Sequence, residues 1–301
     1  MVDEVLEGLN CQSSQEMPGK TYVDCTLGPG GHTEAILNAS APHGKVIGID
    51  RDGAALKLAT ERLKGFKNRL TLQKGAFKEL GKIMATLQIE TADGILFDFG
   101  ISSYQLDTAE RGFSFQKAGP LDMRMDSESG ETAADLVNRL PEKELTLLIK
   151  TLGEERWASR IASRIVRFRE EEKQITRTEE LENIIWRATP RKARHGRIHP
   201  ATRTFQALRM AVNHEIEQIE AGLKAAISRL ACGGRLVVIS FHSLEDRAVK
   251  HCFRGWEKET KYRSKPKYIN LYKKPITAGP DEISRNRRAR SAKLRVLERA
   301  A

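Results

Sequence analysis

The first hundred residues alternate short apolar runs with longer segments in which apolar residues recur every three or four positions. The short runs lie at 21–27, 45–50, 69–75 and 93–100. Their length and composition are typical of buried strands, whereas the segments between them predict helices. Strands that alternate with helices predict βαβ units and a parallel sheet, whose ligand crevice lies at the carboxyl ends of the strands.

The alternation stops after residue 106, and no strand pattern is found from 107 to 200. Helical segments fill this stretch, with stops at Pro141, Gly153 and Pro190 and a capping box predicted at Thr176 and Glu179. The sheet pattern then resumes with a long amphipathic helix from about Phe205, a strand in RLVVISF and a final strand in AKLRVLER. We therefore predict an α/β domain in two parts, 1–106 and 201–301, interrupted by an all-helical insertion at 107–200 that forms a substrate wall or lid beside the crevice.

The composition excludes several classes of protein. No apolar run approaches the ~18 residues of a membrane span, and the N-terminus carries acids where a secretory signal would carry bases. The four cysteines lie far apart without a CxxC pair, so we predict neither a zinc site nor a disulfide framework. We predict that the protein works in a reducing compartment. His195 and His199 are four residues apart, but Gly196 and Pro200 favour a loop there, and we predict no metal.

The positive charge is concentrated at the C-terminal end. The chain carries a net charge of +11, and residues 250–301 alone hold 16 Lys and Arg against 5 Asp and Glu. Aromatic residues are interleaved with these bases: Phe253, Trp256, Tyr262, Tyr268 and Tyr272. Bases neutralise phosphates and aromatic faces accept stacked bases, so single-stranded or looped RNA is the predicted partner. A solvated basic tail is the alternative.

The turn after the first strand, DCTLGPGGHT, has the position of a ligand loop. Gly28 and Gly30 fit the first two glycines of a dinucleotide fingerprint, but Thr33 occupies the third position, and no Walker lysine follows. Asp50 ends the second strand about 20 residues later, where a carboxylate would bind a ribose diol. A nucleoside without phosphates, such as S-adenosylmethionine, suits this combination. A purely structural glycine turn is the alternative.

Three further residues near the predicted crevice are candidates for a role in ligand binding. His32 could be a simple polar residue at a helix start, and Phe77 could be core or the face on which an adenine rests. Asp98 ends the fourth strand, next to the hydroxyls of Ser102 and Ser103. The DFG at 98–100 does not indicate a protein kinase, because the chain has no HRD loop and no VAIK strand.

Long motifs in the right order resemble the small-subunit ribosomal RNA methyltransferase H family, also called MraW. They cover nearly the whole chain: DCTLGPGGHT, GIDRD, DGILFDFGISSYQLDTAERGFSFQKAGPLDMRMD, HPATRTFQALRMAVNHE, GGRLVVISFHSLEDRAVK and RARSAKLR. The resemblance implies a class I, Rossmann-like S-adenosylmethionine-dependent methyltransferase sheet with an inserted helical domain. It further implies methylation of N(4) of cytosine 1402 of 16S rRNA, in the decoding centre.

The resemblance also implies the residues of the cofactor site. The expected contacts to S-adenosylmethionine are Gly30, Gly31, His32, Asp50, Phe77, Asp98 and Gln105. The segment that the family usually writes HGNF reads KGAF here, at 74–77, and an HxPV segment that usually precedes DEVLEGLN is not present. If the N-terminus has been trimmed, an organelle matrix is the alternative to a cytoplasmic location.

The predicted chemistry is an in-line displacement in which an amine attacks the sulfonium methyl group. Cytosine's exocyclic nitrogen is a poor nucleophile because its lone pair is delocalised, so acceptors for its N–H bonds would help it. We predict this catalytic role for Asp98 with Ser102 and Ser103, and a cofactor-binding role alone is the alternative for Asp98. Predicted RNA contacts are Arg203, His242, Arg247, Arg287, Arg288 and Lys293.

Two other questions stay open from the sequence. Asp122, Arg124 and Asp126 in PLDMRMD could organise a substrate loop or pair with each other. The competing functions are a non-catalytic RNA-binding assembly factor on the same fold, a nicotinamide dehydrogenase and a DNA cytosine methyltransferase. The expected partner is small-subunit ribosomal RNA, within the assembled subunit, with no membrane and an undetermined oligomeric state.

Overall fold

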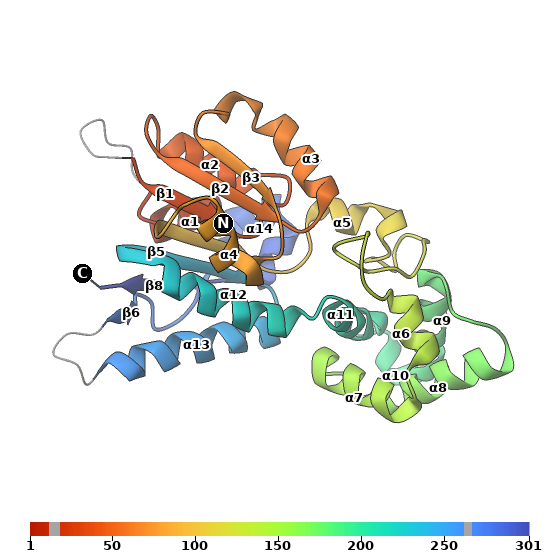
Figure 1. Ribbon diagram of the computed structural model, residues 1–301. Helices are drawn as coiled ribbons and strands as arrows, with labels where there is room; N and C mark the ends of the chain where they lie inside the picture. Colours follow the sequence, from red (N-terminus) through yellow and green to blue (C-terminus); the bar gives the residue numbers. More distant parts are fainter. Residues whose placement is uncertain (12–18, 262–266, 301) are drawn as a thin grey trace. The chain divides into compact units, whose positions relative to one another are not determined.

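The computed structural model describes residues 1–11, 19–261 and 267–300, and the predicted aromatic position Tyr262 lies outside them. The chain forms two units (Figure 1). The sheet unit comprises Met1–Gly100 and Ile216–Ala301, and the helical unit comprises Ile101–Glu215. Within the described parts of the chain, every helix is too short or too polar to span a lipid bilayer.

The sheet unit is built on one mixed sheet with the strand order β3-β2-β1-β4-β5-β8-β6, and β7 pairs with β8. The strands are β1 (Thr21–Asp24), β2 (Lys45–Asp50), β3 (Leu70–Lys74), β4 (Ala92–Asp98), β5 (Leu230–Ser240), β6 (Tyr268–Asn270), β7 (Ile276–Thr277) and β8 (Lys293–Arg299). The pairs among β1 to β5 are parallel, whereas β8 runs antiparallel to its neighbours. The order reverses beside β1, which places a ligand crevice at the carboxyl ends of β1 and β4.

Apolar residues cover both faces of this sheet because successive strand residues point to opposite sides. Ile95 and Phe97 belong to one core cluster, whereas Leu96 belongs to another. The first face packs against α4 (Leu80–Thr86), α12 (Glu215–Arg229) and α13 (Ser243–Lys261). The second packs against α1 (Val2–Gly8), α2 (Gly31–Ala39) and residues near α14 (Pro280–Arg285). Helix α3 (Gly53–Arg62) adds a small cluster, and three short 3-10 turns complete this unit: η1 (Lys64–Phe66), η2 (Phe77–Glu79) and η4 (Arg287–Ser291).

The helical unit has its own apolar core, formed by residues such as Ile149, Ile161, Ile185 and Leu208. Its helices are α5 (Ser103–Asp107), α6 (Ala133–Arg139), α7 (Glu142–Gly153), α8 (Ala158–Glu171), α9 (Thr178–Ala188), α10 (Arg191–Arg194) and α11 (Ala201–Val212), with the 3-10 turn η3 at Ala109–Arg111. A separate core of this size supports description as a distinct unit.

Several sequence expectations need correction at their boundaries. The helical unit extends beyond 107–200 at both ends and comprises Ile101–Glu215. At its C-terminal end, α11 contributes Phe205 and Leu208 to the helical core. The single long helix expected from Phe205 is two helices, α11 and α12, separated at His214, whose φ of 48° is left-handed and breaks the helix.

The expected cap of α9 is also wrong. The helix begins at Thr178, and the Glu180 carboxylate accepts hydrogen bonds from the N–H groups of Thr176 (3.0 Å) and Arg177 (3.2 Å). Thr178 is buried and its hydroxyl donates to the carbonyl of Lys117 (3.1 Å). The helix therefore has Arg177 at its N-cap and Glu180 at N3, each one residue later than predicted.

Candidate active site

The turn between β1 and α2 requires glycine at two positions. Gly28 has a φ of 51° and Gly30 a φ of 86°, in the left-handed region where other residues are strained. A Cβ atom on Gly30 would lie 2.9 Å from Leu63 Cδ1, so the backbone of the loop packs tightly on α3 and its flank. The glycines therefore let the chain turn sharply at the switch point of the sheet.

Asp24, at the end of β1, stabilises this turn through hydrogen bonds. Its side chain is buried and accepts hydrogen bonds from the Thr33 hydroxyl (2.8 Å) and the Thr26 N–H (3.2 Å). Burial raises the pKa of the Asp24 carboxyl, although His32 and these two hydrogen bonds oppose the rise. The threonine that replaces the third glycine of a dinucleotide fingerprint thus has a structural role, because its hydroxyl holds α2 against the end of β1.

Asp50 holds the other side of the loop. Its carboxylate accepts hydrogen bonds from the N–H groups of Gly28 (2.8 Å) and Asp52 (2.9 Å), one on each oxygen. Burial raises the pKa of Asp50 to about 6, although both hydrogen bonds act in the opposite direction. A carboxylate oxygen can accept two hydrogen bonds, so each oxygen of Asp50 can accept one more from a ligand diol.

His32 and Asp98 face each other across the crevice of the sheet unit. His32 Nε2 lies 3.4 Å from Asp98 Oδ2, and the Asp98 N–H donates to Thr26 Oγ1 (2.6 Å). Burial alone would lower the pKa of His32, but the hydrogen bond and charge of Asp98, together with Asp24, raise it overall. Within the described residues, His32 Nδ1 and Asp98 Oδ1 are buried and have no hydrogen-bond partner. Unpaired buried polar atoms are costly, so this pair has the character of a ligand site.

Phe77 lies at the start of η2 and is partly buried. Its ring centroid is 5.6 Å from that of Phe97 and 5.7 Å from that of Phe99. A Cβ atom on Gly222 of α12 would lie 2.6 Å from the Phe77 ring, so the ring is closely packed. Phe77 is therefore attached to the core cluster and also keeps some exposed ring surface.

Ser102, Ser103 and Gln105 come together at the first turn of α5, in the helical unit. The Gln105 N–H donates to Ser102 Oγ (3.2 Å), and the Ser102 N–H donates to Gln105 Oε1 (3.1 Å). This reciprocal capping box buries Gln105, while Ser103 is exposed. The serines predicted as catalytic therefore belong to a helix start, and the roles of Ser102, Ser103 and Gln105 at the reaction centre stay predictions.

The residues predicted to contact RNA have different environments. Arg247, Arg287 and Arg288 are exposed side chains of α13 and η4. Lys293 Nζ lies 3.1 Å from Asp246 Oδ2, and His242 Nε2 lies 3.0 Å from Glu245 Oε1. Arg203, on α11 of the helical unit, donates to the carbonyl of Glu154 (3.0 Å).

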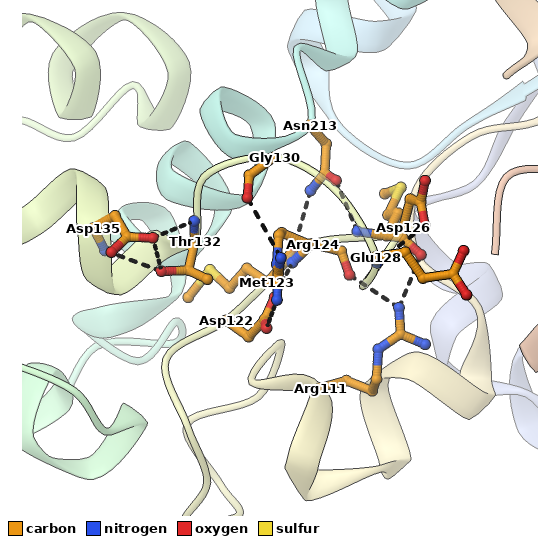
Figure 2. Close-up of polar contacts among 11 residues, drawn as sticks. Arg111, Asp122, Met123, Arg124, Asp126, Glu128, Gly130, Thr132, Asp135 and Asn213 are labelled. Carbon is orange, nitrogen blue, oxygen red and sulfur yellow. Dashed lines mark hydrogen bonds and ion pairs between the residues drawn. The ribbon is translucent and has the colours of Figure 1, made fainter. Parts of the chain in front are cut away.

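The PLDMRMD segment forms a tightly held loop in the helical unit (Figure 2). Asp122 accepts hydrogen bonds from Arg124 Nε (2.9 Å) and Nη2 (2.7 Å), and Asp126 accepts one from Ser129 (3.0 Å). The three charged residues therefore use local partners. The buried Met123 has a left-handed φ of 62°, which is uncommon for a residue with a large side chain.

Two residues outside the loop keep it in this shape. Asn213 accepts from the Met125 N–H (2.9 Å) and donates to the Met123 carbonyl (2.8 Å), as Figure 2 shows. Arg111 Nη2 donates to the carbonyls of Arg124 and Met125, both at 2.9 Å. Sequence reasoning missed Asn213 and Arg111, because only the folded helical unit brings them beside a loop that is distant in the chain.

The strand order is that of a Rossmann-like methyltransferase. The glycine turn without a Walker lysine and the carboxylates at the ends of β1, β2 and β4 agree with this class. The chain belongs to the MraW methylase family, whose model matches residues 1–300. This family comprises S-adenosylmethionine-dependent methyltransferases, so the predictions of fold class, family and cofactor are confirmed.

Curated relatives agree with the family assignment. Three proteins named "Ribosomal RNA small subunit methyltransferase H" were compared, and each match covers most of both chains. The protein from Trichlorobacter lovleyi is 52% identical over 94% of this chain and 93% of its own length. Those from Pelobacter propionicus (52%) and Geobacter sulfurreducens (51%) each match over 99% of this chain and 97% of their own length.

Proposed function

We propose that this protein transfers the methyl group of S-adenosylmethionine to the exocyclic N(4) of a cytosine in small-subunit ribosomal RNA, at position 1402. The name shared by the curated relatives supports the polymer. The arrangement of His32 and Asp98 supports an amine acceptor. The assembled small subunit is the proposed form of the substrate.

The observation that carries the chemical proposal is the unpartnered Asp98 Oδ1 at the end of β4. When bound, S-adenosylmethionine supplies a methyl group on a positively charged sulfur. Asp98 Oδ1 would accept a hydrogen bond from the cytosine amine, which draws electron density toward nitrogen and strengthens it as a nucleophile. His32, whose Nε2 lies 3.4 Å from Oδ2, would orient the carboxylate.

The proposed cofactor contacts divide between the loop and the strand ends. Gly30 and Gly31 offer backbone, Asp50 accepts the ribose hydroxyls, and Phe77 offers ring surface to the adenine. Among the described residues, no lysine or arginine side chain forms an ion pair with Asp24, Asp50 or Asp98. A cationic sulfonium suits such a site better than a phosphate would, because phosphates bind where positive charge is available.

The direct test is identification of the product. The protein is incubated with methyl-labelled S-adenosylmethionine and small subunits from a strain that lacks the modification. The RNA is then digested to nucleosides and separated. We expect the label in N(4)-methylcytidine, and fully modified subunits should accept none.

Two results would contradict the proposal. Label in another nucleoside would remove the assignment to N(4), and label in free DNA but not in subunits would remove the assignment to RNA. RNA binding and cofactor binding without any transfer would instead favour a non-catalytic assembly factor.

A further inference from the structure

A second concentration of positive charge lies in the helical unit, in addition to the basic C-terminal segment of the sheet unit. Residues 183–214 contain seven Lys and Arg and no Asp or Glu. The chain's totals hide this excess, because acidic residues of α7 to α9 precede it and offset it in any sum over the first 249 residues.

Four of these cations are exposed. They are Arg187, Arg191, Lys192 and Arg197, and we call them the basic segment. Within the described residues, no ion pair involves any of the four. Several exposed cations elsewhere in the helical unit are paired with an acid: Arg139 with Glu131, Arg167 with Glu171, Lys173 with Glu180 and Arg177 with Glu179. Residues 187–197 therefore carry four exposed cations with no acid among them in the sequence.

The backbone that carries the basic segment is held in place by a stack of three rings. The His199 ring lies between Phe115 (centroids 4.7 Å apart) and Trp186 (5.5 Å), with interplanar angles of 23° in both cases. His199 Nδ1 accepts from the Ala201 N–H (3.2 Å), and Nε2 lies 3.4 Å from Glu182. These contacts fix the loop after α10 to α9.

Arg194 secures the other end of the segment. Its Nε donates to the Thr189 carbonyl (2.9 Å), its Nη2 donates to the Arg187 carbonyl (3.3 Å), and its guanidinium lies 5.7 Å from the centre of the Trp186 ring. One arginine is therefore used to shape the segment, and its four neighbours keep their charges exposed. Cations presented on an ordered backbone lose less conformational entropy on binding than cations on a free tail.

We propose that the basic segment binds the sugar-phosphate backbone of the RNA substrate, in addition to the contacts expected from the sheet unit. Three of its four cations are arginines, whose planar guanidinium groups bind phosphate in a bidentate manner. Ile198, which is 52% exposed, lies within the segment and offers an apolar contact for a sugar or base. This inference rests on the proposed function for the identity of the polymer.

The test measures the salt dependence of RNA binding by the full-length protein. The probe is a fluorescent single-stranded RNA of about 20 nucleotides that copies the sequence around the target cytosine. For Arg191→Glu/Lys192→Glu we expect the slope of log K against log salt to decrease by roughly 1.4, since each phosphate contact on a single strand contributes about 0.7. Affinity at 100 mM salt should fall by about tenfold or more.

A matched control carries the same change of charge elsewhere in the helical unit. Lys143→Glu/Lys150→Glu alters two exposed lysines of α7 and should leave the slope unchanged. Circular dichroism and calorimetric binding of S-adenosylmethionine should be the same for both variants and the wild type. An unchanged slope in Arg191→Glu/Lys192→Glu, or an equal decrease in the control, would overturn the inference.

Competition separates RNA from an acidic protein partner. Polyglutamate of equal charge should displace the RNA only weakly. If it displaces the RNA as well as unlabelled RNA does, the segment is a general polyanion surface and the proposal of an RNA site is wrong. If the salt slope of Arg191→Glu/Lys192→Glu decreases as expected but the product assay yields no N(4)-methylcytidine, the result would count against the proposed function alone. Methyl transfer with an unchanged slope would count against this inference alone.

Discussion

Among the described residues, the sheet unit has carboxylates that form no ion pair with a lysine or arginine, and the helical unit has exposed cations that form none with a carboxylate. In the sheet unit, Asp24, Asp50 and Asp98 meet at strand ends, and in the described residues no lysine or arginine forms an ion pair with them. In the helical unit, no ion pair between described residues involves the basic segment, whose four cations are exposed. Both units also contain paired charges, such as Arg235 with Glu298 and Arg139 with Glu131.

This difference distinguishes binding regions from structural ones. A buried carboxylate without a cation is costly, and an exposed group of like charges repels itself. Both arrangements gain stability when a ligand of the opposite sign arrives. The sheet unit then suits a cationic sulfonium and an amine, whereas the helical unit suits phosphates. Five predictions test the comparison.

The largest expected effect is that of Asp98→Asn. The amide cannot accept a proton or a strong hydrogen bond in the same way, so the rate of methyl transfer should fall roughly 10²–10⁴-fold. Single-turnover rates at saturating S-adenosylmethionine measure this, with cofactor affinity determined separately by calorimetry. Asp3→Asn, an exposed change on α1, is the control. Unchanged turnover at saturating cofactor would leave Asp98 only a binding role.

A paired charge should behave differently, with a loss of stability instead of turnover. Arg295 is 5% exposed and its Nε lies 2.7 Å from Asp246 Oδ1. Burial favours a higher pKa for Asp246, but hydrogen bonds from Arg295 and Lys293 lower it overall. Asp246→Ala should reduce the free energy of unfolding by about 3 kcal/mol, because it leaves a buried cation unpaired.

Urea denaturation measures this loss, and the double variant Asp246→Leu/Arg295→Met is its control. The double variant removes both charges and should recover most of the lost stability. If the two variants are equally unstable, lost packing and not the unpaired charge explains the result.

Asp50 should give the sheet unit a pH-dependent affinity for cofactor. Its pKa of about 6 means that the carboxylate is largely protonated at pH 5. If the ionised form binds the ribose hydroxyls, the dissociation constant should rise about tenfold between pH 7 and pH 5. Calorimetric titrations across this range measure it, and Asp50→Asn should lose the step near pH 6.

The stability of the cofactor-free protein should respond to Asp50 in the opposite direction. The folded-state pKa is raised above the ordinary value of 3.8, so the folded state binds the proton more tightly than the unfolded state. The stabilisation from this group is complete below about pH 4 and is lost as the pH rises through about 6. Thermal unfolding of wild type and Asp50→Asn at pH 4 to 8 would show whether this holds.

The smallest effect is expected for an exposed pair of the helical unit. Arg167 and Glu171 of α8 lie one turn apart and are 63% and 57% exposed. Arg167→Gln should leave the urea midpoint unchanged within error, since solvent screens such pairs. RNA affinity should change by less than about twofold. A decrease as large as that of Arg191→Glu/Lys192→Glu would show that any cation of this unit matters equally, and the comparison would fail.

The sequence predicted the parts of the site that depend on strand periodicity. Asp50 and Asp98 were expected at strand ends, and they end β2 and β4. This succeeded because buried parallel strands give continuous apolar runs whose last residue is easy to locate. The helical character of the middle of the chain was predictable for a similar reason, from helical periodicity and its stop signals.

The parts that escaped prediction depend on tertiary contacts. Asn213 holds Met123 and Met125 from a distance of about ninety residues, and nothing local marks it. The left-handed His214 divides a periodic pattern that reads as one helix. The basic segment was missed because the net charge of the first 249 residues is zero. Which cations form ion pairs depends on the side chains that lie near them in the folded chain.

The insertion of the helical unit between β4 and β5 has a consequence for synthesis on the ribosome. These two strands are neighbours in the sheet, yet β5 begins about 130 residues after β4 ends. At about 5–20 residues per second, the partner of β4 emerges roughly 7–26 seconds later. During that interval the nascent chain would carry an unsatisfied β4 edge, which invites pairing with other chains, so early folding of the inserted helices or chaperone capture would protect the growing polypeptide.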